Sequence, residues 1–218
     1  MPVAGDIYVS EFLTIAGAHL FAVASPGPDF AIVLRQSLSY GRVAGLWTSG
    51  GIALGILLHV SYCVLGVGLL LSSSPNLFMM VKVVAAVYLV LLGYRALKDS
   101  VRVTKTRSEE RADHSGSARQ WLITGFLTNG LNPKATLFFL ALFTVVIDIQ
   151  TPILVQSLYG LYLSIATFCW FALLSLILGL KSVRARILQA GVWFERVMGL
   201  VLIFLGLQLA LSLPPNFL

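Results

Sequence analysis

Apolar residues dominate this chain in six long runs that short polar or charged stretches separate. The runs cover roughly residues 8–38, 44–71, 77–97, 121–146, 153–180 and 192–213. Each run reaches the length of about 20 mostly apolar residues that a helix needs to cross a lipid bilayer. The runs do not alternate apolar and polar positions as barrel strands do, and open strands leave backbone groups unsatisfied in lipid. The pattern therefore predicts an all-α integral membrane protein with six transmembrane helices.

Basic residues gather at alternate connections between these runs. Arg35 and Arg42 flank the first connection, seven Lys or Arg residues flank the third, and four flank the fifth. The second connection has only Lys82 at its edge, and the fourth has none. Cytoplasmic loops of membrane proteins carry the excess of Lys and Arg. We therefore expect connections one, three and five in the cytoplasm and both termini outside.

The third connection divides the chain into two halves of three runs each, residues 1–97 and 121–218. Its residues, 98–120, have a soluble composition, and their charge predicts a flexible cytoplasmic linker. Moving residues 81–97 forward by 113 positions lays them on 194–210, so that "LLGY" meets "FLGL". Because each half has an odd number of spans, the halves cross the membrane in opposite senses. We expect two inverted three-helix repeats, an arrangement typical of secondary transporters.

Proline motifs interrupt the first and fourth runs near their middle. The first motif contains Ser25, Pro26, Gly27, Pro28 and Asp29, and the second contains Asn132, Pro133 and Lys134. Proline removes a backbone donor and disfavours the helical conformation of the residue before it. Asparagine is a good N-cap, and proline suits the first helical position. Each interrupted run is therefore predicted to stop and to restart as a new helix near the midplane.

A helix start favours an anion, because it carries unpaired amide hydrogens and the positive end of the helix dipole. Inverted halves would bring the two starts to one cavity from opposite sides of the membrane. Charged residues within a span are costly and face the bundle interior or a watery cavity. We therefore expect Asp29 to take the ammonium of a zwitterion, while Lys134 and the free amides take its carboxylate.

Four further side chains or backbone positions join this predicted substrate site: Ser25, Gly27, Asn129 and Asn132. A second interpretation of the same residues stays open. Asp29 and Lys134 would then pair with each other and lock the two halves together, and the prolines would serve only as kinks.

Composition excludes several other classes of protein. The chain is 58% hydrophobic and 11% charged, with a mean hydropathy of +0.90, whereas soluble domains are about 45–50% apolar and about 25% charged. The net charge of +6 lies between apolar runs and does not indicate nucleic-acid binding. The first 12 residues lack Lys and Arg, unlike a cleaved signal peptide. We see no nucleophile and base at motif spacing, so we expect no enzyme, no prosthetic group and no metal.

Three blocks of the sequence resemble a known family. They are "SPGPDFAIVLRQSLSYGRVAGLWTSGGIALG" (25–55), "LVLLGYRALK" (89–98) and "GFLTNGLNPKATLFFLALF" (125–143). They are similar to the signature blocks of the lysine exporter and homoserine/threonine efflux family (LysE/RhtB), and the resemblance covers essentially the whole chain. Many relatives place a glutamine after "FLALFT", where this chain has Val145 and Val146.

The resemblance implies efflux of an amino acid across the bacterial inner membrane by a multi-pass protein, coupled to the proton motive force. The substrate would be small and neutral, such as homoserine or threonine, or basic. The partners would then be the amino acid, the coupling proton and the lipid bilayer, and the sequence leaves a homo-oligomer open. The family's motif positions fall on the two proline motifs described above.

His59 and the cysteines leave further interpretations open. His59 lies near the middle of the second run and would either relay protons with Asp29 or serve as a packing residue. Cys63 and Cys169 occupy nearly repeat-related positions, which a membrane thiol-disulfide carrier would need. Neither cysteine has a nearby cation that would favour its reactive thiolate. A divalent-metal exporter of similar architecture would need more ligands than Asp29 and His59 provide.

Overall fold

The computed structural model describes residues 4–25, 27–99, 116–148, 150–177 and 181–211. These residues form helices and contain no strand. The elements are α1 (Ala4–Ala24), α2 (Pro28–Tyr40), α3 (Arg42–Ser73), α4 (Pro75–Asp99), α5 (Ala118–Gly130), α6 (Pro133–Ala141), the π-helix η1 (Leu142–Val146), α7 (Ile153–Ile177) and α8 (Lys181–Leu211). The expected all-α fold is thus confirmed for the described part of the chain.

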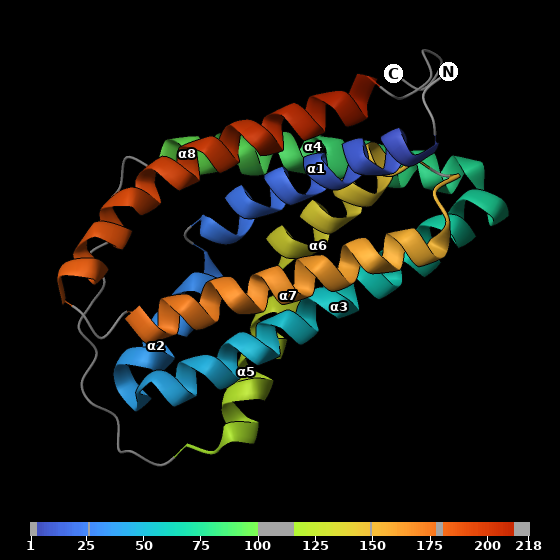
Figure 1. The fold of residues 1–218 in the computed structure, drawn as a ribbon. Coiled ribbons are helices and arrows are strands. Elements are labelled where there is room, and N and C mark those ends of the chain that lie inside the picture. The colour runs from blue at the N-terminus through green and yellow to red at the C-terminus, as the bar shows by residue number, and fades with distance from the viewer. Residues whose placement is uncertain (1–3, 26, 100–115, 149, 178–180, 212–218) are drawn as a thin grey trace.

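The helices form one elongated bundle. Figure 1 shows α4 and α8 side by side along one flank and α3 and α7 along the other, with α1 and α6 between them. Apart from the junctions of α1 with α2 and of α5 with α6, the helices begin and end at two opposite ends of this bundle. At the end that we call the linker end, α2 meets α3, α4 and α7 finish, and α5 and α8 begin (Figure 1). At the other, the terminal end, α1 begins, α8 finishes, and α3 meets α4.

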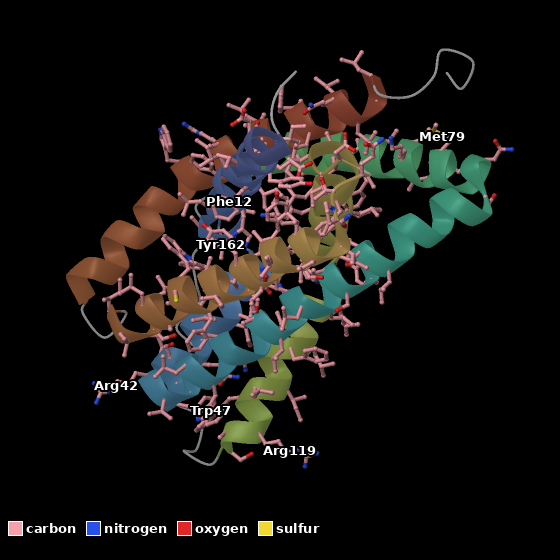
Figure 2. All side chains as sticks on the ribbon, turned by 45° about the vertical axis from the view of Figure 1, so that its right-hand side comes forward. Phe12, Arg42, Trp47, Met79, Arg119 and Tyr162 are labelled. Carbon is pink, nitrogen blue, oxygen red and sulfur yellow. The ribbon has the colours of Figure 1, made fainter. Side chains whose placement is uncertain are left out.

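Basic side chains mark the linker end. Figure 2 shows Arg42 and Arg119 there, whereas Met79 lies at the terminal end. Arg35, Arg95 and Lys98 are also exposed near the ends of their helices. The alternation of charged and uncharged connections along the sequence therefore corresponds to two physically distinct ends of the bundle.

Short irregular junctions separate α1 from α2 and α5 from α6. Gly27 is the N-cap of α2 and has an extended backbone, and Pro28 takes the first helical position. The N-cap of α6 is Asn132, whose side-chain oxygen accepts from the Lys134 amide at 3.0 Å. These are the residue types that favour helix starts, because proline has no amide to leave unpaired and asparagine supplies an acceptor. Pro26, also expected at the first junction, lies outside the described residues.

Glycines let several helix pairs approach closely. A Cβ added to Gly51 on α3 would overlap the Leu122 carbonyl on α5, and one on Gly125 would overlap the Thr48 carbonyl. Close packing through small residues is typical of helices in lipid. Gly51 and Gly55, four positions apart on α3, are thus contact points between α3 and α5.

The contact between α4 and α8 is likewise built on small residues. A Cβ at Gly93 would lie 2.5 Å from the Gly199 carbonyl oxygen, and one at Gly206 would lie 2.9 Å from the Ala86 carbonyl oxygen. The two helices run in opposite directions (Figure 1). Each helix therefore offers two points, seven positions apart, at which its backbone touches the other helix.

A buried carboxylate joins the first helix to the segment before α7. Glu11 is 6% exposed and accepts from the Asp148 amide at 2.7 Å, from the Thr151 hydroxyl at 2.9 Å and from the Tyr159 hydroxyl at 3.1 Å. A buried charge is tolerated when several donors satisfy it. Glu11 therefore fixes α1 against the second half of the chain at the terminal end.

Large apolar side chains cover much of the outer surface, among them Leu65 and Leu154, which are 66% and 68% exposed. Three described helices are long and apolar enough to cross a membrane: Asp6–Ala24, Arg42–Gly66 and Ile153–Ile177. The segments Pro133–Val146 and Gly199–Leu211 are apolar but shorter. An exposed apolar surface of this kind suits a lipid environment.

Some boundaries differ from those expected. The last helix begins at Lys181, eleven positions before the apolar run, because Lys and Arg are good helix formers and extend it past the apolar core. Lys98 and Asp99 belong to α4, and Ala118 begins α5, so both margins of the expected linker are helical. Residues 100–115 of that linker lie outside the described residues.

Candidate functional site

A cavity of about 60 Å³ lies where α1 gives way to α2 and α5 gives way to α6. Its polar lining comes from both junctions, from the preceding part of α1 and from α7. Its apolar wall is largely aromatic. The polar members are His19, Ser25, Asp29, Asn129, Asn132, Lys134 and Thr167, and the aromatic members are Phe30, Phe138, Phe139 and Phe171.

Asp29 stands in the first turn of α2 and faces this cavity. One carboxylate oxygen, Oδ2, accepts from the Asn129 side-chain amide at 2.9 Å. The other, Oδ1, is buried and has no hydrogen-bond partner among the residues that the structure describes. A buried acceptor without a partner is costly, so Asp29 is suited to bind a donor that enters the cavity.

Lys134 stands in the first turn of α6 and reaches across to the other junction. Its Nζ donates to the Ser25 hydroxyl at 3.2 Å, and its ammonium interacts electrostatically with Asp29. A Cβ at Gly27 would lie 3.8 Å from the same Nζ. This is an ordinary van der Waals distance, so the ammonium lies directly beside the start of α2.

Asn132 and Asn129 shape the second junction. Asn132 caps α6 with its side chain, and its backbone amide donates to the backbone carbonyl of Asn129 at 2.9 Å. Both asparagines are buried, at 6% and 1% exposure. Of the expected site residues, the structure thus brings Ser25, Gly27, Pro28, Asp29, Asn129, Asn132 and Lys134 to one cavity. Pro133 opens α6 next to them.

His59 does not line the cavity but lies directly behind it. Its Nε2 lies 3.0 Å from the Asn129 carbonyl oxygen and must carry the hydrogen, because a carbonyl only accepts. In a neutral ring Nδ1 then accepts from the Tyr62 hydroxyl. The imidazole also stacks on Phe139, with ring centroids 5.5 Å apart. His59 is therefore connected to Asp29 through Asn129 rather than by direct contact.

Comparisons with known proteins decide what kind of protein carries this cavity. Residues 20–213 match the family described as LysE type translocator. The chain belongs to this family. The threonine efflux protein of Escherichia coli K12 is 24% identical over 203 residues, which cover 92% of this chain and 98% of that protein. The leucine efflux protein of Klebsiella pneumoniae is 26% identical over 208 residues, which cover 93% and 95%.

An uncharacterized membrane protein of Haemophilus influenzae is 26% identical over 195 residues, which cover 89% of this chain and 93% of that protein. No solved structure matches the chain. The resemblance seen in the three sequence blocks is confirmed by the family match. Membership of a translocator family makes the chain a membrane transporter and not an enzyme.

In this LysE family member the cysteines stand apart from the cavity. Cys63 is buried and Cys169 is exposed; both are free thiols, and neither lines the cavity. Across the part of the chain that the structure describes, we find no group of three His, Cys, Asp or Glu side chains arranged to hold a metal ion. The polar chemistry of the cavity rests instead on Asp29, Lys134 and their neutral neighbours.

Sequence reasoning missed His19 and Thr167. Their side chains line the same cavity, and His19 Nε2 lies 2.9 Å from the Thr167 hydroxyl. The presence of His19 within the first apolar run was a usable signal, because an ionisable residue inside a span points to function. Thr167 gave no such signal, because a hydroxyl in a span also bonds readily to its own helix.

Proposed function

We propose that this protein is a secondary transporter that exports a small amino acid across the bacterial inner membrane. One observation carries the proposal: a single buried cavity holds a carboxylate with an unpartnered oxygen, a lysine ammonium and the starts of two helices. The threonine and leucine efflux proteins among its relatives agree with this substrate class.

The zwitterionic part of an amino acid matches the charges of the cavity. Its ammonium would donate to Asp29 Oδ1, and its carboxylate would accept from Lys134 Nζ and from amides at the helix starts, where the dipoles favour an anion. The part of the site that binds these two charged groups also includes Ser25, Gly27, Asn129 and Asn132. Because Asp29 is the one acidic residue in the described lining, a second cation on a basic substrate would lack a counter-charge. A neutral substrate such as threonine or homoserine therefore fits better than lysine.

The pairing of α4 with α8 supports two inverted repeats. The offset of 113 positions carries Ala86 to Gly199 and Gly93 to Gly206. Exchanging the halves thus turns the contact of Gly93 with Gly199 into the contact of Gly206 with Ala86, and both contacts exist. A two-fold axis between antiparallel helices produces this relation. We propose that α1 with α2, and α5 with α6, are the interrupted helices of the two repeats, and that the halves rock about the cavity.

Coupling to protons follows from the same carboxylate. We propose that Asp29 binds either the substrate ammonium or a proton, so that export of one accompanies import of the other. His59 would support this exchange by positioning Asn129, to whose carbonyl it donates. The basic linker end supports a cytoplasmic location for residues 98–120 and an external location for both termini. An acidic external medium should then accelerate efflux, and a protonophore should abolish the acceleration.

Efflux of preloaded radiolabelled amino acids tests the function. Cells expressing the wild type should release threonine or homoserine faster than cells without it. Asp29→Asn and Lys134→Ala should each lower that release at least about tenfold, because each removes a charge-assisted bond. Asp148→Asn and Lys98→Ala, exposed and away from the cavity, are the matched controls.

Membrane levels of every variant are measured on the same cells. Release unchanged in both cavity variants would contradict the site. A wild type that retains every amino acid tested would contradict the function itself.

A further inference from the structure

His19 on α1 and Thr167 on α7 form a hydrogen-bonded pair in the wall of the cavity. The ring Nε2 and the hydroxyl are 2.9 Å apart, and the two residues are 4% and 1% exposed. His19 makes no other hydrogen bond to the residues that the structure describes, which leaves Nδ1 without a partner. This pair therefore has hydrogen-bonding capacity that the described part of the protein does not use.

The pair lies apart from the charged residues, in an otherwise apolar part of the lining. His19 precedes the end of α1 at Ala24 by five residues, which is about 7.5 Å along a helix axis. Between His19 and the end of α1, the cavity is lined by Ala22 and Val23, and on α7 Phe171 lies one turn from Thr167. A small amino acid held by its charged groups at the junction would extend its side chain toward this pair.

We propose that His19 and Thr167 are specificity-determining residues that bind a hydrogen-bonding group on the substrate side chain. The inference rests on the proposed amino-acid efflux and adds which side chains are preferred. The Thr167 hydroxyl and the His19 ring offer both a donor and an acceptor, which suits a hydroxyl. A site with a few placed polar groups in an apolar wall selects substrates in this way.

Helix packing alone does not account for the pair. α1 and α7 are already joined away from the cavity, where Phe12 and Tyr162 meet edge to face with ring centroids 4.8 Å apart (Figure 2). The Tyr159 hydroxyl adds a bond to the Tyr8 carbonyl at 3.0 Å. The bond between His19 and Thr167 satisfies one ring nitrogen only, and a buried polar atom without a partner, such as His19 Nδ1, is costly unless a ligand or water bonds to it.

Threonine and valine test the inference, because they have nearly the same shape and differ in a hydroxyl against a methyl. Sites that hydrogen-bond a substrate hydroxyl discriminate strongly against the analogue that lacks it. We expect wild-type cells to release preloaded threonine at least about fivefold faster than preloaded valine, the effect of one net hydrogen bond. Thr167→Val and His19→Leu should bring the ratio of the two rates close to one.

Three further variants separate specificity from structure. Thr167→Ser and His19→Gln keep a hydrogen-bonding group and should restore most of the preference for threonine. Thr48→Val is the matched control, because the Thr48 hydroxyl is buried but bonds to Ala44 of its own helix outside the cavity. It should leave the ratio unchanged.

The result that overturns the inference is a wild type that exports amino acids with equal rates for threonine and valine. Variants at His19 and Thr167 that slow both substrates equally would also overturn it, because a purely structural pair acts in that way. For variants with low membrane levels, thermal stabilisation of the purified protein by threonine and by valine compares the binding of the two amino acids instead. A wild type that exports no amino acid would instead overturn the proposed function, and this inference with it.

Discussion

The side-chain amide of Asn129 donates a 2.9 Å hydrogen bond to the carboxylate of Asp29, although the two residues are 100 positions apart in the chain. Asn129 belongs to the end of α5 and Asp29 to the start of α2. The bond therefore holds the two junctions against each other on one side of the cavity. On the other side, Lys134 reaches back to Ser25.

Removal of the Asn129 side chain should impair the site without unfolding the protein. A hydrogen bond to a charged group contributes about 1.5–3 kcal/mol, so Asn129→Ala should lower threonine efflux about ten- to a hundredfold. Initial rates of release from preloaded cells measure the effect. Asn76→Ala, at an exposed position on α4, is the matched control. Efflux within twofold of wild type would show that this bond does not serve transport.

We expect His59 to support transport by positioning Asn129 and not by relaying a proton. His59→Gln retains a donor for the Asn129 carbonyl, whereas His59→Leu removes it. We expect the glutamine variant to keep most of the efflux and its dependence on external acidity, and the leucine variant to lose about tenfold. If the glutamine variant exports amino acids but no longer responds to external pH, His59 relays the proton instead.

Exchange of the two cavity charges distinguishes substrate binding from a structural ion pair. Asp29→Lys combined with Lys134→Asp preserves an opposite-charge pair across the junctions but moves each charge to the other helix start. We expect normal membrane levels and loss of efflux, because the substrate's ammonium and carboxylate would each meet the wrong environment. Efflux restored relative to either single variant would favour the interpretation in which Asp29 and Lys134 only lock the halves together.

The glycine contacts between α4 and α8 should tolerate little added volume. Gly93→Val and Gly206→Val place side chains against a facing backbone, and we expect each to destabilise the protein by at least about 2 kcal/mol. Because the proposed inverted repeat relates the two positions, their effects should be similar. Gly66→Val is the control, since nothing lies within 4 Å of a Cβ there. The midpoint of thermal unfolding in detergent measures the loss, and equal stability of all three variants would contradict the repeat contact.

Much of this architecture was predictable because membrane insertion imposes simple rules on local sequence. Long apolar runs indicated helices, and the prolines at Pro28 and Pro133 indicated where new helices begin, since proline cannot continue a helix from the preceding turn. The same residues carried the family resemblance that the match over residues 20–213 confirms. Helix ends were less predictable, as the start of α8 at Lys181 shows, because a helix continues past its apolar segment at little cost.

The sequence by itself determined that this is a helical membrane protein of a translocator family, with Asp29 and Lys134 as unusual charges in apolar surroundings. Only the tertiary structure decided which distant residues meet in and behind the cavity: Asn129 beside Asp29 and His19 bonded to Thr167 in its lining, and His59 behind Asn129. The physical reason is that apolar periodicity specifies a helix but scarcely its rotation or its neighbour. Those depend on close packing at points such as Gly51, where the backbone of another helix must fit.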